Sequence, residues 1–312
     1  MESLQLAFVS VAPIFLLMAL GYFLKQIQFA KKETFDAVNK MVFRIFLPVL
    51  LFYNIYTTES ARIFDFSLIL FTVIAVLAVF LLGWVSVLAL SKENTKRGVM
   101  LQGFFRSNYA ILGIPLIGYV CGDDARGLAS LMAAVVVPLF NVLAVIALER
   151  FREGKPNPKK MLLGVLKNPL IIACVLGMVF FGFGIKLPSV LEKTVGELSK
   201  VATPLAIIVL GASFTFSAIK GYRKEITIVV LARLVIVPLL MLSAAALLGF
   251  RNEAIACLLV VSGSPVAVSS FAMAQQMGGD EELAAQIIVI SSAFCLVTLF
   301  VWIFLLSHFG LV

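Results

Sequence analysis

The stretch RSNYAILGIPL, residues 106–116, lies inside an otherwise apolar segment that runs from about residue 99 to residue 121. That segment is long enough to cross a bilayer as one helix. An arginine, a serine and an asparagine followed by a Gly-x-Pro sequence are unusual in such a helix, because lipid cannot hydrogen-bond the backbone that a proline frees. A break of this kind persists only where protein or a watery cavity surrounds it. The stretch is therefore a candidate binding site within a membrane.

The composition places the chain among membrane proteins. Of its 312 residues, 62% are hydrophobic and 13% are charged, and the mean hydropathy is +1.08. A soluble domain is nearer to one half apolar and about one quarter charged. The net charge of +8 comes from basic residues scattered through short connections, without the basic patch that nucleic-acid binding requires. With one histidine, His308, and four cysteines that form no C-x-x-C pair, we expect no metal site and no cofactor.

Apolar runs of spanning length recur along the whole sequence. They cover approximately residues 5–24, 36–56, 66–90, 98–121, 127–149, 162–185, 198–218, 226–249, 253–276 and 283–307. Runs of this length predict an all-α polytopic membrane protein with ten transmembrane helices.

The two halves of the sequence resemble each other. A shift of 156 residues places Pro13 on Pro169, Gly21 on Gly177 and Pro48 on Pro204. The longest connection, the basic stretch 149–167, falls at the midpoint, so we predict a first five-helix repeat over 1–148, a cytoplasmic linker over 149–167 and a second repeat over 168–312. Because five spans are an odd number, the second repeat would enter the membrane from the opposite side, as in many secondary transporters.

Loop charges give the orientation. With the N-terminus outside, the cytoplasmic connections would carry fifteen Lys and Arg residues and the external connections six. This positive-inside bias predicts that both termini lie outside and that the linker lies in the cytoplasm.

The fourth and ninth spans occupy equivalent places in the two predicted repeats, and both are interrupted. The ninth contains VSGSPVAVSS, residues 261–270, in which small and polar residues surround Pro265. Each break alone is equally consistent with an ordinary kinked helix. Two breaks at matched positions favour a site in which half-helix N-termini attract an anion.

The charged residues within the spans point in the same direction. Arg106 and Arg233 are the two basic residues that lie clearly inside a span, away from its ends, and each can pair either with a ligand or with backbone carbonyls. No Asp or Glu lies in the middle of a span, which argues against cation transport on a buried carboxylate pair and favours an anion bound near Arg106 and Asn108. Hydroxyls and amides that remain candidates for ion or polar contacts are those of Ser262, Ser264, Gln275 and Gln276. Asn141 is a further candidate for such a contact, although it is first expected to hydrogen-bond a neighbouring helix, and Asn54 is expected to lie near the outer end of its span.

Several motifs resemble those of the auxin efflux carrier family, which includes the plant PIN-formed auxin exporters and bacterial proteins described as malate or malonate permeases. The fourth span is similar in Asn108, Gly113-Ile114-Pro115-Leu116 and Cys121-Gly122. The fifth is similar in Pro138 and Asn141, and the seventh in Pro204-Leu205-Ala206 and Leu210-Gly211-Ala212-Ser213. The ninth is similar in Ser264-Pro265, Ser270-Phe271-Ala272 and Gln275-Gln276. The resemblance covers essentially the whole chain.

The resemblance implies a fold like that of bile-acid–sodium symporters and sodium–proton antiporters. Spans 1, 2, 6 and 7 would form a scaffold that often dimerises, and spans 3–5 and 8–10 a mobile transport domain. Asn108 would bind a substrate carboxylate where the fourth and ninth spans cross, near Gly113, Pro115 and Pro265. Ser262 and Ser264 stand where the plant proteins have a second asparagine, which argues against an aromatic auxin. Arg106 matches the bacterial branch, so the expected location is the bacterial inner membrane.

The leading hypothesis is a secondary carrier that moves a small organic anion, such as a carboxylate or an auxin-like acid, by an elevator-like motion. An anion channel or a membrane-embedded anion sensor is the alternative. No nucleophile–base pair or metal cluster that would indicate an enzyme is visible. The residues leave open the direction of transport and whether sodium or a proton is the coupling ion.

Overall fold

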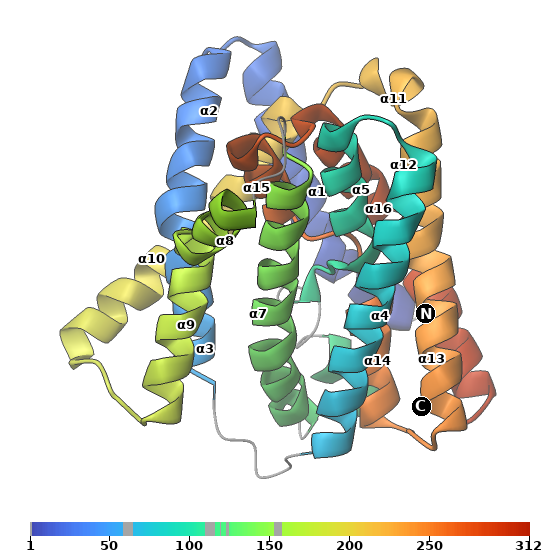
Figure 1. Cartoon of the computed structure of the whole chain (residues 1–312). Coiled ribbons are helices and arrows are strands. Elements are labelled where there is room, and N and C mark those ends of the chain that lie inside the picture. Colours follow the sequence, from blue (N-terminus) through green and yellow to red (C-terminus); the bar gives the residue numbers. More distant parts are fainter. Residues whose placement is uncertain (1, 59–64, 110–115, 119, 123–124, 153–157) are drawn as a thin grey trace.

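The structure is a computed structural model that describes residues 2–58, 65–109, 116–118, 120–122, 125–152 and 158–312 (Figure 1). Within these ranges the regular structure is helical, apart from one isolated antiparallel backbone bridge. The helices are α1 (Glu2–Gln26), α2 (Lys32–Met41), α3 (Leu47–Tyr56), α4 (Phe66–Leu90), α5 (Asn94–Phe105), α7 (Arg126–Arg150), α8 (Pro158–Leu166), α9 (Pro169–Gly182), α10 (Ser189–Ser213), α11 (Ala218–Gly221), α12 (Arg223–Leu231), α13 (Val237–Leu247), α14 (Glu253–Gly263), α15 (Ser269–Met277) and α16 (Glu281–His308). Two π-helical segments, Val42–Phe46 and Ala232–Ile236, join α2 to α3 and α12 to α13. The predicted all-α class is confirmed.

Five of the helices are long and apolar enough to cross a membrane. They are Phe66–Leu90, Gly127–Arg150, Ser189–Ser213, Arg223–Leu247 and Glu281–His308. Shorter apolar helices, among them α9 and α14, cover other predicted spans. The length and composition of these helices are those of a multi-pass membrane protein, while the count of ten spans stays a prediction.

The helix α4 illustrates why the fold needs lipid around it. Its buried residues, among them Leu68, Thr72 and Val76, recur every three or four positions and form one stripe. The opposite face is also apolar: Ile74 and Leu81 are more than half exposed. A helix that is apolar all round but buried along one stripe has to present its other face to a nonpolar solvent.

The interrupted helices lie at the centre. Every residue from Gly98 to Phe105 in α5 and from Ile255 to Gly263 in α14 is buried. These helices contact the surrounding helices α4, α7, α13 and α16 on several sides. Polar groups at their ends are therefore shielded from lipid by protein.

Two predicted boundaries were wrong. The run 162–185 is divided, because Asn168 caps α9 by accepting a hydrogen bond from the backbone N–H of Leu170 at 2.9 Å, and α8 ends before it. The span expected to begin at 198 begins at Ser189. Its first turns are rich in Glu, Lys and Ser, so they extend the helix without extending the apolar run.

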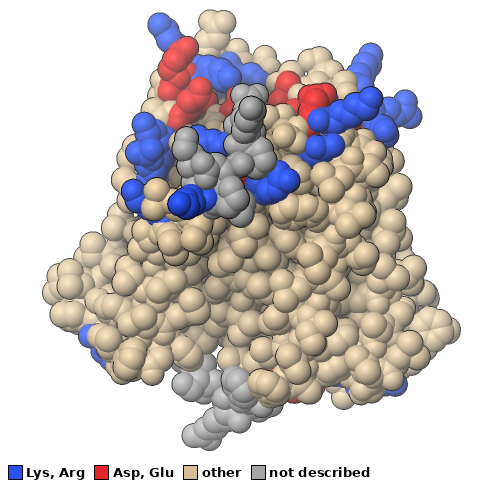
Figure 2. All heavy atoms as spheres, viewed as in Figure 1, with Lys and Arg blue, Asp and Glu red and all other residues tan. Residues whose placement is uncertain are grey.

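Charged side chains gather at one end of the molecule. In Figure 2 most of the visible Lys, Arg, Asp and Glu residues lie at the top, where α2, α5, α8 and α12 begin in Figure 1, and a broad uncharged belt lies below them. The belt matches the exposed apolar residues of α4, α9 and α13. This end is the one predicted from loop charge to face the cytoplasm.

A close glycine contact joins α1 to α10, and a similar contact joins α9 to α3. A Cβ atom added at Gly21 would overlap the carbonyl oxygen of Ile208, and one added at Gly177 would lie 3.2 Å from the carbonyl oxygen of Phe52. The two contacts correspond residue by residue under the shift of 156 residues: Gly21 corresponds to Gly177, and Phe52 corresponds to Ile208. The same helix–helix approach thus occurs twice, each time between the two halves, with the glycine supplied once by each half.

Gly21→Ala should destabilise the protein, because backbone and not a movable side chain fills the space beside Gly21. Overpacking of this kind costs about 1–3 kcal/mol. Gly127→Ala is the matched control, since an added Cβ there meets nothing within 4 Å. The measurement is the thermal unfolding midpoint in detergent, and equal midpoints for both variants would contradict the proposed packing.

Candidate functional site

The two interrupted helices meet at their breaks. Helix α5 ends at Phe105, and Ser107 forms an antiparallel bridge with Val266 in the segment between α14 and α15. The backbone N–H of Asn108 donates to the carbonyl of Pro265 at 2.9 Å, and that of Ala267 donates to the carbonyl of Arg106 at 3.4 Å. We call this pair of segments, Arg106–Asn108 and Ser264–Ala267, the crossing. Two other residues predicted for it, Gly113 and Pro115, lie outside the described residues.

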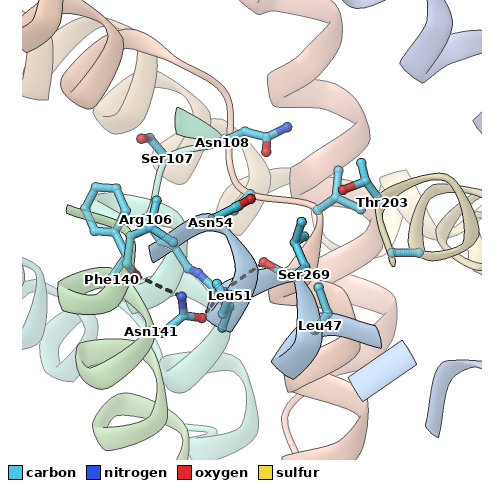
Figure 3. Close-up of a pocket in the computed structure, with 15 residues that line it drawn as sticks. Leu47, Leu51, Asn54, Arg106, Ser107, Asn108, Phe140, Asn141, Thr203 and Ser269 are labelled. Atoms are coloured by element: carbon cyan, nitrogen blue, oxygen red, sulfur yellow. Dashed lines mark hydrogen bonds between the residues drawn. The ribbon is translucent and has the colours of Figure 1, made fainter. Parts of the chain in front are cut away.

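A pocket of about 70 Å³ lies beside the crossing (Figure 3). Its polar wall consists of Arg106, Ser107, Asn108, Asn141 and Ser269. Its other wall is formed mainly by Leu47, Leu50 and Leu51 of α3, Val137 and Phe140 of α7, and Thr203 and Ala206 of α10. Asn54 of α3 also lines it. The pocket therefore joins the crossing to helices from both halves of the sequence.

Arg106 is held by neutral partners. Its side chain is buried and donates to Asn141 Oδ1 at 2.7 Å, Ser269 Oγ at 2.8 Å and Gln102 Oε1 at 3.1 Å. Ser270 Oγ accepts a longer bond at 3.4 Å. Among the ion pairs of the described residues, none involves Arg106. Its positive charge is positioned by these contacts but not neutralised.

Asn108 carries an unpaired donor. Its side chain is 6% exposed, and Nδ2 is buried without a hydrogen-bond partner within the described part of the chain. An unpaired buried polar group of this kind costs about 1–3 kcal/mol. A ligand oxygen in the pocket would satisfy the amide.

Arg233 is positioned in the opposite way, by backbone carbonyls. Its Nη1 donates to the carbonyls of Phe104 and Phe105 at 3.4 and 3.2 Å, at the C-terminal end of α5. Nη2 and Nε donate to the carbonyls of Val261 and Ser264 at 2.6 and 2.9 Å, at the C-terminal end of α14. One guanidinium thus caps both interrupted helices.

The electrostatics of the two arginines therefore differ. The C-terminal ends of two helices carry roughly half a negative charge each, so they compensate Arg233. Arg106 instead contacts Ser269 and Ser270, the first residues of α15, where the helix dipole is positive. Among the side chains that the structure describes, these two are the buried charged ones. The pocket is consequently electropositive and suited to an anion.

Over the same residues, no group of three His, Cys, Asp or Glu side chains is arranged to hold a metal ion.

The structure brings some of the other predicted residues to the pocket and separates others from it. Asn141 lines it and also bonds to Arg106, so the expected contact with a neighbouring helix is present. Ser262 donates to the Leu258 carbonyl of its own helix, and Ser264 is buried beside Arg233, so neither lines the pocket. Gln275 bonds to α2 near the charged end, and Gln276 is half-buried in α15.

Asn54, Thr203 and Ser269 line the pocket although they were not predicted as site residues. Asn54 was expected near the membrane surface, but it reaches the pocket because α3 lies beside the crossing (Figure 3). The sequence did contain a signal for Asn54 as a pocket residue: it is a polar residue in an apolar run, six positions after Pro48. Thr203 directly precedes Pro204 and had no comparable signal.

The chain matches known proteins along nearly its whole length. A family model described as "Membrane transport protein" matches residues 6–161 and 155–303. A protein of Methanothermobacter thermautotrophicus named "Uncharacterized transporter" is 25% identical over 94% of this chain and 96% of its own length. The "Uncharacterized transporter YfdV" of Escherichia coli is 23% identical over 94% and 95%. A "Putative malonate transporter" of Rhizobium meliloti is 24% identical over 92% of both chains.

Asn141→Asp should remove most of the attraction of the pocket for anions while leaving the fold intact. The substitution places a carboxylate within 2.7 Å of Arg106 Nη2, so the free charge of the pocket is neutralised internally. A fixed charge about 4 Å from the ligand is worth roughly 4 kcal/mol at an effective dielectric constant near 20, or several hundred-fold in affinity.

The measurement is carboxylate binding to the purified protein, for example by thermal shift. Asn141→Ser is the matched control, since it keeps a neutral acceptor beside Arg106. Equal affinities for the two variants would show that the charge of Arg106 does not drive binding.

Proposed function

This chain belongs to the auxin efflux carrier family of membrane transport proteins, and we propose that it is a secondary carrier of a small organic anion. The observation that carries the proposal is that one pocket is lined both by the guanidinium of Arg106, which has no ion pair among the described residues, and by Asn108, whose Nδ2 has no hydrogen-bond partner among them. An organic anion in the pocket would receive a charge-assisted hydrogen bond from Arg106 and a neutral one from Asn108. The positive N-terminal end of α15 adds to the attraction.

A short dicarboxylate is the first substrate to test. The pocket of about 70 Å³ is far below the roughly 300–1,000 Å³ of sites for drug-sized ligands, so it favours a compact acid over an aromatic one. One carboxylate would bind to Asn108 and the second near Arg106. Malonate has this shape, and a relative of similar length carries malonate in its name.

We further propose the inverted-repeat plan, with α1–α3, α9 and α10 as a scaffold and α4, α5, α7 and α12–α16 as a mobile transport domain. The recurrence of the Gly21 contact at Gly177 supports the repeat. The position of the pocket supports the division, since its polar wall comes from the crossing, α7 and α15, and its apolar wall largely from α3 and α10. Substrate would then lie between the moving and the stationary parts.

The access path favours an outward-facing state. A second pocket of about 160 Å³, lined by Thr57, Thr58 and Ala134 among others, shares Asn54 and Val137 with the first and lies toward the uncharged end. At the charged end, Gln275 of α15 donates to Asp36 Oδ1 at 2.9 Å and accepts from the side chain of Asn39. We name this contact between α2 and α15 the latch. It would hold the transport domain against the scaffold on the cytoplasmic side.

Proteoliposomes that contain the protein should accumulate labelled malonate, and Asn108→Ala should reduce the uptake at least about tenfold because the carboxylate loses a buried donor. Thr298→Val is the control, since Thr298 is half-buried, bonds only within its own helix and does not line the pocket. Saturable uptake and counterflow indicate a carrier, sustained channel-like currents would point to a channel, and binding without counterflow to a sensor. Full activity of Asn108→Ala would refute the site.

Gln275→Ala should shift the protein toward an inward-facing state, because the latch loses both hydrogen bonds. Each bond contributes about 0.5–1.5 kcal/mol, so the shift is expected to be about fivefold or more. The measurement is the rate at which an impermeant maleimide labels Asn54→Cys from outside, in a background without the native cysteines. The rate should fall for Gln275→Ala and stay the same for Gln276→Ala. A rate unchanged by Gln275→Ala would rule out the latch.

A further inference from the structure

We infer that the guanidinium of Arg233 occupies the position of a coupling cation at the crossing, so that anion transport proceeds without bound sodium. The inference rests on the proposed carrier function and concerns a different group from the anion site. It starts from the backbone carbonyls that the two helix breaks leave without intrahelical partners.

Those carbonyls form a cation-binding arrangement. In carriers with discontinuous helices, unwound carbonyls and half-helix C-terminal ends coordinate Na⁺ or a proton. Here the equivalent oxygens belong to Phe104 and Phe105 of α5, and to Val261 and Ser264 at the end of α14. All four accept hydrogen bonds from Arg233, at 2.6–3.4 Å. The ligands that a free cation would use are therefore occupied by a side chain.

The charge of the arrangement also fits one fixed cation. Two helix C-termini supply roughly one negative charge in total, and Arg233 supplies one positive charge. No ion pair involves Arg233 in the described part of the chain, and its side chain is 1% exposed. The carbonyls are thus the groups that compensate it. A second cation at the same carbonyls would be repelled and would lack ligands.

The position of Arg233 in its own helix is adapted to this contact. It lies in the π-helical segment Ala232–Ile236, which interrupts the regular α-helix between α12 and α13. Such segments change the direction of side chains and are frequent at functional sites. The planar guanidinium reaches carbonyls of two helices at once, which an ammonium group cannot do with the same geometry.

The experiment compares wild type, Arg233→Gln and Arg233→Lys in sodium, guanidinium and choline chloride at matched low ionic strength. The unfolding midpoint of the wild type should be the same in all three salts. Arg233→Gln keeps a donor but lacks the charge, so sodium or guanidinium should raise its midpoint by about 3 °C or more over choline. Arg233→Lys retains a tethered charge and should be insensitive to the salt.

Malonate uptake by the wild type should also be equal in sodium and choline at a clamped membrane potential. A wild type that needs sodium for stability or uptake would overturn the inference, and so would Arg233→Gln that is equally unstable in every salt. Absence of carboxylate transport by the wild type would instead refute the proposed function. The two failures are distinguishable, because the salt response of Arg233→Gln requires no carboxylate.

Discussion

The bonds between Arg233 and the C-terminal ends of α5 and α14 are the contact on which the centre of the structure depends. Broken helices in a membrane leave carbonyls that lipid cannot satisfy. Here one side chain satisfies the ends of both helices, and the bridge between Ser107 and Val266 joins the segments that follow. With their ends fixed in this way, the helices can present irregular backbone to a pocket at the centre of the molecule.

The two buried arginines show that burial alone does not determine what a charge does. Arg233 faces the negative ends of two helices and is compensated by backbone. Arg106 faces the positive end of α15 and side chains that carry no charge. The first is therefore structural in its effect on the crossing, and the second leaves a positive charge available to a ligand. The difference comes from which ends of the helices meet each residue.

Much of the fold and part of the site could be predicted from the sequence. Hydropathy gives the membrane class, and proline with small polar residues gives the break around Pro265. Arg106, Asn108 and Asn141 line the pocket, and they stand out in the sequence because they are polar residues inside apolar runs. Asn54 is also a polar residue in an apolar run, but its place in the pocket, like that of Thr203, depends on which helix packs beside the crossing, and a one-dimensional pattern does not contain that. Likewise, the sequence allowed Arg233 a ligand or a carbonyl partner, and only the packing decides between them.

The distance along the chain between the members of the crossing affects how the protein is made. Phe104 and Arg233 are 129 residues apart. At a synthesis rate of about 5–20 residues per second, the carbonyls at the end of α5 wait on the order of ten seconds before their partner leaves the ribosome. During that interval the first half sits in the membrane with an open helix end. The inserted N-terminal half is therefore an intermediate, and its helix end is satisfied only when the second half has been made and Arg233 can bond to it.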